Sequence, residues 1–461
     1  MMKIAGNPIV LFFSYCWVLI LVSIIRCQTL IPYDFGFVFI AIILQSFVFV
    51  SFSRGFFNQS YWVFSLLFFG MVPIIEIEFN VRSYVGMPAL TDSDIMYAGI
   101  FIFGLNLLYA ISYEVFKKRG HVNIIPEQVL ELKKNTEYKN NVFFIFSIII
   151  GAICFIVVFE DMNNNIVSLF FRGGDFQDTN EEWGPQKLII QRFIRPIPMI
   201  LFLSFVLLYG YKSKIKLLLL FVVAVVVAFP TSLPRFVAAS LYIPIIFVFV
   251  PRLKKGLSYF YFLILSLLFI FPLLNSFRRY NSDDGFILIT AGDLKFFVEG
   301  HFDSFQTFAQ VIAHEIITYG EQLVMVFLFW VPRSIWGQKP VSSGVEIGQR
   351  LGAYFTNMSA NIYAEGWINF GFLGAVLFAI LLGFISSKID SYFYLLLKFN
   401  ILALKAKLKL QILAYFILSA LFFITLRGDL VTGVSNTLGV IFAWSLVFLL
   451  SRIVDKKLFS S

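Results

Sequence analysis

The chain is dominated by apolar runs of about 20 residues, the length that an α-helix needs to cross the hydrocarbon core of a bilayer. Of its 461 residues, 59% are apolar and only 14% are charged. A segment that crosses lipid must pair its backbone polar groups internally, so each run predicts a transmembrane helix. The twelve predicted spans are 8–25, 35–52, 60–79, 95–116, 142–159, 196–211, 215–231, 236–250, 257–274, 368–386, 410–426 and 437–451. We therefore expect an all-α polytopic membrane protein that forms one integral membrane domain over residues 1–461.

The charges of the connecting segments predict how these spans are oriented. With the amino terminus inside, the inner segments hold 22 of the 36 Lys and Arg residues and 6 of the 27 Asp and Glu residues. The outer segments hold the other 14 basic and 21 acidic residues, so the net charge is +16 inside and −7 outside. Cytoplasmic loops normally carry such an excess of basic residues. Both termini and the basic loop 117–140 are thus expected in the cytoplasm, and the overall charge of +9 does not indicate nucleic-acid binding.

Lysine and arginine are distributed differently across the predicted membrane. Lysine accounts for 18 of the 22 inner basic residues, whereas arginine accounts for 11 of the 14 outer ones. Inner lysines are the ordinary signal for orientation, but outer arginines need another explanation. Because a guanidinium is a rigid fork of donors that matches phosphate or carboxylate, this preference favours recognition of an anion outside the membrane.

Two outer loops are longer than the other connections. The first covers 160–195 and the second covers 275–367, which is rich in aromatic residues and is therefore expected to be ordered. Within the second loop, the apolar segment Leu323 to Val331 is too short to cross a bilayer. It predicts an interfacial or re-entrant helix over the outer face.

Cysteine and histidine usage argues against a metal site or a disulfide framework. Cys16, Cys27 and Cys154 lie in or beside predicted spans without paired spacing, and are expected to be apolar packing residues. The chain has three histidines and no HExxH or paired Cys and His spacing. No phosphate-binding loop or dinucleotide fingerprint is present either, so we expect neither a protein-bound metal nor a cofactor. The first apolar run has no small-residue cleavage site and predicts a retained anchor.

The outer arginines recur near the predicted outer ends of the spans. A lipid-linked pyrophosphate would lie at that depth, with its chain in the bilayer and its sugars in water. Such arginines also bind ordinary lipid headgroups or pair with nearby acids, as Arg278 and Arg279 could with Asp283 and Asp284. The candidates are Arg172, Arg192, Arg195, Arg235, Arg278, Arg279, Arg333, Arg350 and Arg427.

Three short motifs resemble a known family. The segment Ala364-Glu365-Gly366-Trp367-Ile368-Asn369-Phe370-Gly371, followed by Gly374, is similar to the one that closes the large outer loop in O-antigen polymerases of the Wzy type. The turn Ser232-Leu233-Pro234-Arg235 and the triplet Arg427-Gly428-Asp429 also resemble positions of that family, as does the overall arrangement of spans. The paired Arg-x10-Gly loop motifs of some members are not reproduced, because Trp183 stands where the Gly after Arg172 is expected.

The resemblance implies a glycosyl transfer at the outer leaflet of a bacterial cytoplasmic membrane. A growing glycan on one polyprenyl diphosphate would pass to a new lipid-linked repeat unit, building an O-antigen or capsule. The implied partners are polyprenyl-diphosphate-linked oligosaccharide, membrane lipids, a chain-length regulator and a flippase. Arginines that neutralise the departing diphosphate would make a metal unnecessary.

The transfer also needs a base for the acceptor hydroxyl. The outer candidates are Glu365, His314 with its neighbour Glu315, and Asp175. His314 is also explained as a polar position on a short loop helix. Glu365 precedes a span, where it could equally form a salt bridge to an outer arginine. Outer aromatic residues such as Trp183, Trp330, Trp336, Tyr354, Tyr363 and Trp367 could stack on sugars or form the interfacial belt.

Three functions from different classes remain open at this point. The first is the polymerase, and the second is an O-antigen ligase, which would use the same diphosphate site with a different acceptor. The third is a flippase or transporter of lipid-linked oligosaccharide. The large outer loop and the scarcity of charged residues in the middle of the spans argue against transport.

Overall fold

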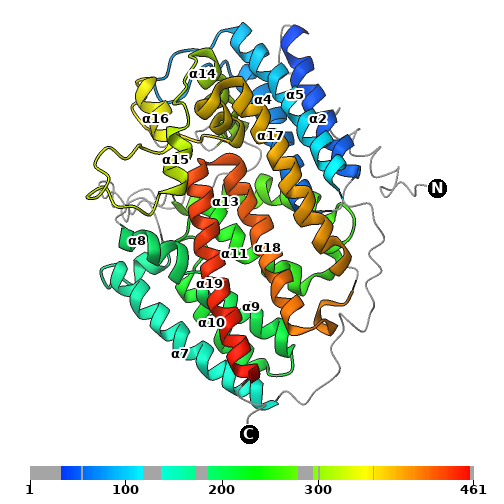
Figure 1. Cartoon of the computed structure of the whole chain (residues 1–461), viewed down its shortest axis with the longest axis vertical. Coiled ribbons are helices and arrows are strands. Elements are labelled where there is room, and N and C mark those ends of the chain that lie inside the picture. The colour runs from blue at the N-terminus through cyan, green and yellow to red at the C-terminus, as the bar shows by residue number, and fades with distance from the viewer. Residues whose placement is uncertain are drawn as a thin grey trace, which may run out of the picture.

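Apolar helices form the body of the molecule (Figure 1). The computed structural model describes residues 33–52, 55–117, 137–171, 185–278, 294–298, 302–356, 358–397 and 399–456, and this part of the chain contains no β-strand. Seven of its helices are long and apolar enough to cross a membrane, so the chain is a multi-pass membrane protein. They are Phe56–Glu78, Asp92–Phe116, Lys139–Asp161, Lys187–Tyr209, Ile362–Tyr394, Ala406–Arg427 and Leu430–Val454.

Each predicted span from 35 onward coincides with an apolar helix, whereas the predicted span 8–25 lies outside the described residues. Several crossings are assembled from shorter elements, and three of these contain a π-helical segment. The bounds are α2 Tyr33–Phe52, α3 Phe56–Phe64, η1 Ser65–Met71, α4 Val72–Glu78, α5 Asp92–Phe116, α7 Glu137–Asp161, α8 Pro185–Ile189, η4 Ile190–Ile194, α9 Ile197–Tyr209, α10 Lys214–Val227, α11 Arg235–Phe249, α12 Ser258–Leu265, η6 Ser266–Ile270, α13 Phe271–Arg278, α17 Ile362–Leu396, α18 Ala406–Arg427 and α19 Leu430–Lys456.

Prolines explain where some helices begin and end. The expected span 215–231 ends at Val227, because a residue before proline disfavours helical geometry and Pro230 follows. The last residues of the predicted outer loop 160–195 are helical, since α8 begins at Pro185 and η4 continues to Ile194. Pro196 then lies before the first residue of α9, where its missing N–H removes no helical hydrogen bond.

The large second loop is folded from short helices. These are η7 Leu294–Val298, α14 Ser304–Ala313, α15 Glu321–Phe327 and α16 Ser343–Arg350. The segment expected to form a non-crossing helix does so in part, as α15. This helix packs through Met325 and Val326 against Val431 at the start of α19. The loop therefore closes over the ends of α17, α18 and α19 (Figure 1).

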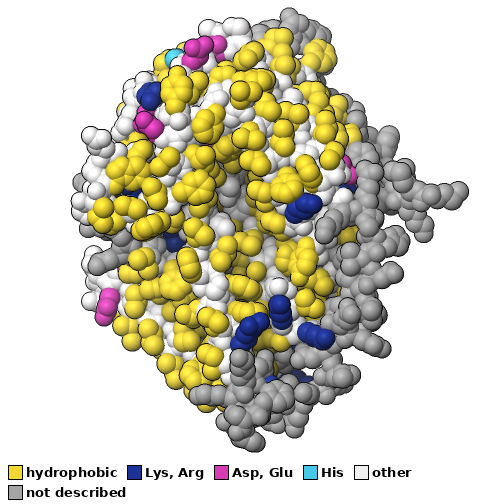
Figure 2. Space-filling model, in the orientation of Figure 1, with side chains coloured by type: hydrophobic (Ala, Val, Ile, Leu, Met, Phe, Trp, Pro, Cys, Tyr) yellow, Lys and Arg dark blue, Asp and Glu magenta, His cyan; other side chains and the backbone are white. Residues whose placement is uncertain are grey.

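The helices pack in two groups around a centre. Helices α2, α3, α5 and α17 form one group, while α7, α9, α10 and α19 form the other (Figure 1). Helix α18 packs against α3, α9, α11, α17 and α19, and so lies between the groups. Hydrophobic side chains cover most of the face shown in Figure 2, as a lipid-facing surface requires.

Buried polar contacts fix α17 within its group. The Tyr61 hydroxyl donates to Asn106 Oδ1 at 2.5 Å and also meets the hydroxyl of Tyr363 on α17. Asn106 Nδ2 donates in turn to Ser65 Oγ at 2.8 Å. Hydrogen bonds of this kind hold membrane helices together where lipid supplies no hydrophobic driving force.

The other end of α17 is held by the carboxylate of Asp390, which is only 2% exposed. Gly55 allows this approach, because a Cβ there would lie 2.0 Å from Asp390 Cγ. A carboxylate at the N-terminus of α3 satisfies helix donors that have no partner within the helix. The groups donating to it are the backbone N–H groups of Phe57 and Asn58 and the hydroxyls of Tyr113 and Tyr415, at 2.7 to 3.1 Å.

Candidate functional site

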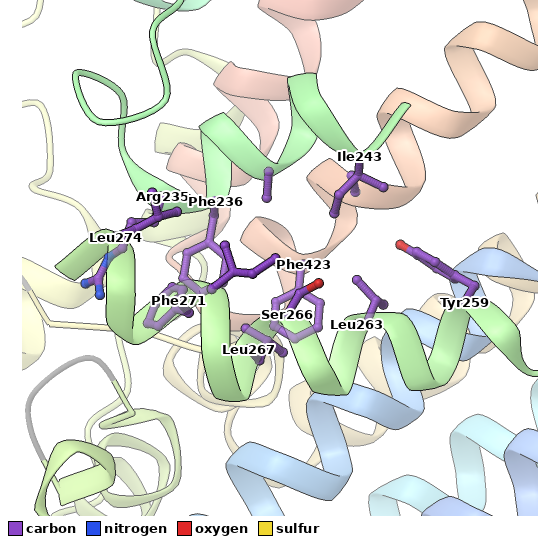
Figure 3. A pocket seen from close by; sticks show the side chains of 13 residues that line it. Arg235, Phe236, Ile243, Tyr259, Leu263, Ser266, Leu267, Phe271, Leu274 and Phe423 are labelled. Atoms are coloured by element: carbon purple, nitrogen blue, oxygen red, sulfur yellow. The ribbon is translucent and has the colours of Figure 1, made fainter. Parts of the chain in front are cut away.

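A narrow apolar groove runs between α11, α18 and the continuous helix α12–η6–α13 (Figure 3). Its cavity volume is about 70 Å³, well below the roughly 300 Å³ of a typical small-molecule pocket. Such a groove fits a segment of hydrocarbon chain better than a compact polar ligand. It is lined by Arg235, Phe236, Ala239, Ile243, Tyr259, Leu263, Ser266, Leu267, Ile270, Phe271, Leu274, Ala420 and Phe423.

The local sequence shapes this groove. The π-helical turn η6 widens the helix at Ser266 to Ile270, and π segments inside α-helices often mark functional positions. Small residues on the opposing helices, Ala239 and Ala420, leave space that larger side chains would fill. Tyr259 lies at one end of the groove and Arg235 at the other (Figure 3).

Arg235 is the first residue of α11, directly after Pro234. Its guanidinium carbon lies 4.0 Å from the centroid of the Phe271 ring, a cation–π contact that orients the planar group. A helix N-terminus carries a partial positive charge, to which the Arg235 guanidinium adds a full one. This end of the groove is therefore electropositive.

Arg427, the last residue of α18, contacts the second ring of this aromatic pair. Its guanidinium carbon is 5.5 Å from the Phe236 ring, and the Phe236 and Phe271 ring centroids are 5.1 Å apart. Two arginines from the predicted set, 192 positions apart in sequence, therefore flank two touching rings at one end of an apolar groove. The structure thus combines an apolar groove with two arginines near one of its ends.

Asp303 forms an ion pair with Arg427. Oδ1 of Asp303 lies 3.3 Å from Nη2 of Arg427, and Oδ2 accepts from the Ser359 backbone N–H at 3.2 Å. The aspartate side chain is 4% exposed and that of Arg427 is 18% exposed. Burial raises the pKa of Asp303 above its ordinary value, and the nearby Arg427 charge only partly opposes this. The neighbouring Phe302 ring packs 5.9 Å from Phe271, so Asp303 adjoins the groove.

Glu365 is fully buried near the start of α17 and is held by two donors. Its Oε2 accepts from Ser343 Oγ at 2.9 Å, and its Oε1 accepts from the Leu430 backbone N–H at 2.7 Å. These contacts join α16, α17 and α19. The sequence left two roles open for Glu365. Among the described residues, neither of its oxygens forms a salt bridge to an arginine. To act as a base, the carboxylate would first have to lose one of its two hydrogen-bond donors.

Arg192 and Arg195 occupy different settings on one turn. Arg192 Nη1 donates to Ser435 Oγ on α19, and Asp429 lies within electrostatic range of Arg192. Arg195 is 1% exposed, and each of its three guanidinium nitrogens donates to an oxygen of the protein. Arg195 therefore ties the helices together in the interior, away from the groove. Its acceptors are Val227 O, Gln191 Oε1 and Ser232 Oγ, at 2.6 to 2.9 Å.

The remaining described candidates lie in the large loop. His314 follows the last residue of α14 and is exposed, roughly 16 Å along that helix from Asp303 at 1.5 Å per residue. Arg333 is exposed and donates to the Lys339 carbonyl at 2.7 Å, while Arg350 pairs with Glu346 at 2.6 Å. None of these three makes a contact with the groove lining or with Asp303 among the interactions of the described residues.

Some candidates fall outside the part of the chain that is described. Arg172, Asp175 and Arg279 lie outside the described residues, and only the backbone of Arg278 is described, as the last residue of α13. Cys154 is buried in α7, as expected for a packing residue. Within the described ranges, no group of three His, Cys, Asp or Glu side chains could hold a metal ion.

Sequence reasoning did not identify Asp303, Phe236 or Phe271. A single aspartate between Phe302 and Ser304 has no motif around it, and apolar rings in a span resemble ordinary packing residues. Comparisons with family models, with curated proteins and with solved structures found no match for this chain. Its function is therefore inferred from the site itself.

Proposed function

We propose that this chain is a polymerase of polyprenyl-diphosphate-linked oligosaccharide, working at the outer leaflet of a bacterial cytoplasmic membrane. In this proposal the chain crosses the membrane twelve times with both termini in the cytoplasm, and the large loop 275–367 lies outside. The product is a surface polysaccharide, an O-antigen or a capsule. A flippase supplies the repeat units, and a chain-length regulator acts on the product.

The observation that supports this proposal best is the groove with arginines at one end. A polyprenyl diphosphate is a long apolar chain attached to a compact, highly charged group. The lining from Ile243 to Leu274 suits a stretch of that chain, while Arg235 and Arg427 suit the charged group. Each charge-assisted hydrogen bond contributes about 1.5 to 3 kcal/mol, so two arginines suffice to hold it.

The same arginines assist the chemistry. As the bond between the sugar and the diphosphate breaks, negative charge grows on the departing phosphate oxygen. A fixed guanidinium stabilises that charge more strongly in the transition state than in the bound substrate, and this difference lowers the barrier. Stacking on Phe271 holds Arg235 in place before the reaction, so little reorganisation is needed.

Buried carboxylates beside the arginines favour a transferase over a flippase. A transferase needs a base near the sugar, whereas a flippase forms no bond and needs no base for an acceptor hydroxyl. Asp303 forms an ion pair with Arg427, and Asp429 lies within electrostatic range of Arg192. A ligase would use the same groove and arginines, and the acceptor alone distinguishes it from the polymerase.

Deleting the gene and separating the lipid-linked and surface glycans by gel tests the class of function. A single repeat unit in place of a ladder supports the polymerase. Complete polymer stranded on its lipid carrier would replace this proposal with the ligase. Repeat units trapped on the cytoplasmic face would replace it with the flippase.

Filling the groove tests the binding surface separately. Ala239→Phe places a ring among the lining residues, so we expect weaker binding of undecaprenyl diphosphate to the purified protein and unchanged binding of inorganic pyrophosphate. The matched control is Ala152→Phe on the exposed face of α7, which should change neither. Equal loss of both ligands in Ala239→Phe, or loss of neither, would contradict the groove assignment.

A further inference from the structure

The Asp303–Arg427 ion pair lies beside the proposed substrate site. In this pair, Asp303 binds the arginine that the diphosphate of the substrate would also bind. The two side chains share one 3.3 Å contact between Nη2 and Oδ1, not the two parallel bonds of the strongest arginine–carboxylate pairs. The aspartate is nearly inaccessible in this state, at 3% of the residue exposed. A diphosphate, with more charge and more acceptor oxygens, can compete for the same guanidinium.

The surroundings of Asp303 leave it few other ways to balance its charge. The Ser359 backbone N–H supports Oδ2 at 3.2 Å, and the buried Glu76 carboxyl group of α4, a described neighbour within electrostatic range, offers no positive charge. Glu76 is itself buried and accepts from the Tyr84 hydroxyl at 2.9 Å. Once Arg427 turns to another anion, Asp303 is left as a desolvated carboxylate that gains from taking up a proton.

We propose that Asp303 is the general base of the transfer, masked by Arg427 until the diphosphate of the substrate draws that arginine away. This inference rests on the proposed function. The acceptor hydroxyl oxygen forms a bond to the anomeric carbon of the donor glycan. The bond from that carbon to the diphosphate oxygen breaks, and its electron pair leaves with the diphosphate. The hydroxyl proton passes to Oδ1 of Asp303 and from there to water.

The placement of the other carboxylates favours Asp303 for this role. Both oxygens of Glu365 are already occupied by Ser343 and by the Leu430 backbone N–H. Asp429 accepts from the Thr432 backbone N–H at 2.8 Å in the first turn of α19, and so acts as a helix cap. Asp303 alone among the three pairs directly with an arginine at the groove, and its base function is thereby coupled to substrate arrival.

Two measurements on Asp303→Asn test the inference. The full-length protein in nanodiscs is titrated with undecaprenyl diphosphate, and cells carrying the variant are examined for the glycan ladder. The asparagine removes the charge that competes for Arg427, so we expect binding about threefold to tenfold tighter than in the unmutated protein. We also expect the ladder to be lost, because an amide cannot accept the proton. Asp303→Glu keeps a carboxylate and should retain part of the ladder.

The matched control is Glu346→Gln, which breaks the Arg350–Glu346 ion pair in the same loop but away from the groove. It should change neither binding nor the ladder. A normal ladder from Asp303→Asn would overturn the inference, as would weaker binding together with a lower melting temperature, which would make the pair purely structural. If the unmutated protein itself does not bind undecaprenyl diphosphate, that result contradicts the proposed function. It then also contradicts this inference, which rests on that function.

Discussion

At the scale of single residues, the outer arginines differ in what lies next to them. Arg235 and Arg427 contact aromatic rings beside an apolar groove, whereas Arg195 is enclosed by protein acceptors. Arg333 donates to a carbonyl of its own loop, six residues further along the chain. Sequence position near a membrane end is common to most of them, so their neighbours decide which ones can meet a ligand.

Replacing Arg235 with lysine keeps the charge but removes the planar group that stacks on Phe271. We expect at least tenfold weaker binding of undecaprenyl diphosphate, equivalent to about 1.4 kcal/mol, and loss of the glycan ladder. Titration of the purified protein measures the first effect. Arg350→Lys in the large loop is the control, and equal effects of the two substitutions would exclude Arg235 from the site.

At the scale of secondary-structure elements, the N-terminal end of α17 organises the site. Phe370 and Gly371 interrupt the helix, and Gly371 adopts a φ of +60°, a conformation that glycine accepts without strain. On the near side of this kink, Glu365 joins α16 to the first N–H of α19. The Glu365 carboxylate thereby anchors the end of the Arg427-Gly428-Asp429 turn between α18 and α19.

Substitutions at Glu365 separate its positioning role from a catalytic one. The glutamine oxygen can accept from the Leu430 N–H while its NH2 group donates to Ser343 Oγ, so Glu365→Gln should keep the ladder and the melting temperature. Glu365→Ala leaves the buried Leu430 N–H without an acceptor and should destabilise the fold by about 1 to 3 kcal/mol. Thermal unfolding in detergent and the glycan gel measure these effects. A stable Glu365→Gln protein without a ladder would instead assign the base to Glu365.

Close packing at the kink gives a second prediction for this element. A Cβ on Gly374 would lie 1.9 Å from the Gly366 carbonyl oxygen, a distance that requires the backbone to move. Gly374→Ala should therefore lower the melting temperature and weaken undecaprenyl diphosphate binding. Gly104→Ala on α5 is the matched control, because no atom lies within 4 Å of its new Cβ. It should stabilise the protein by about 0.5 to 1 kcal/mol, as alanine does within helices.

At the scale of the whole molecule, the candidate site and the buried Asp390 contacts lie at opposite ends of α17. The groove arginines, Asp303 and the large loop lie at the ends of α17, α18 and α19 that meet α14 to α16, whereas Asp390 closes the other end of α17 (Figure 1). The Lys-rich connection between α17 and α18 follows the end of α17 that contains Asp390. This polarity is what an orientation with an outer active site requires.

Cysteine labelling tests that orientation. In a variant without Cys16, Cys27 and Cys154, a cysteine at Asn164 should react with an impermeant maleimide in intact spheroplasts. A cysteine at Lys212 should react only after lysis, because the basic residues hold that turn inside. Mass spectrometry of the labelled protein measures both, and the reverse pattern would place the groove arginines on the cytoplasmic side.

The sequence by itself predicted the apolar helices from residue 35 onward and a short helix within Leu323 to Val331, found in part as Glu321–Phe327, because span length and hydropathy are properties of contiguous residues. It also identified Arg235 and Arg427 as members of a larger set. Only the tertiary structure decided that these two share an aromatic layer, that Asp303 joins them, and that Arg195 does not. The contacts of Arg427 with Asp303 and Phe236 connect residues more than 100 positions apart, so they depend on how helices pack, which no local pattern in the chain records.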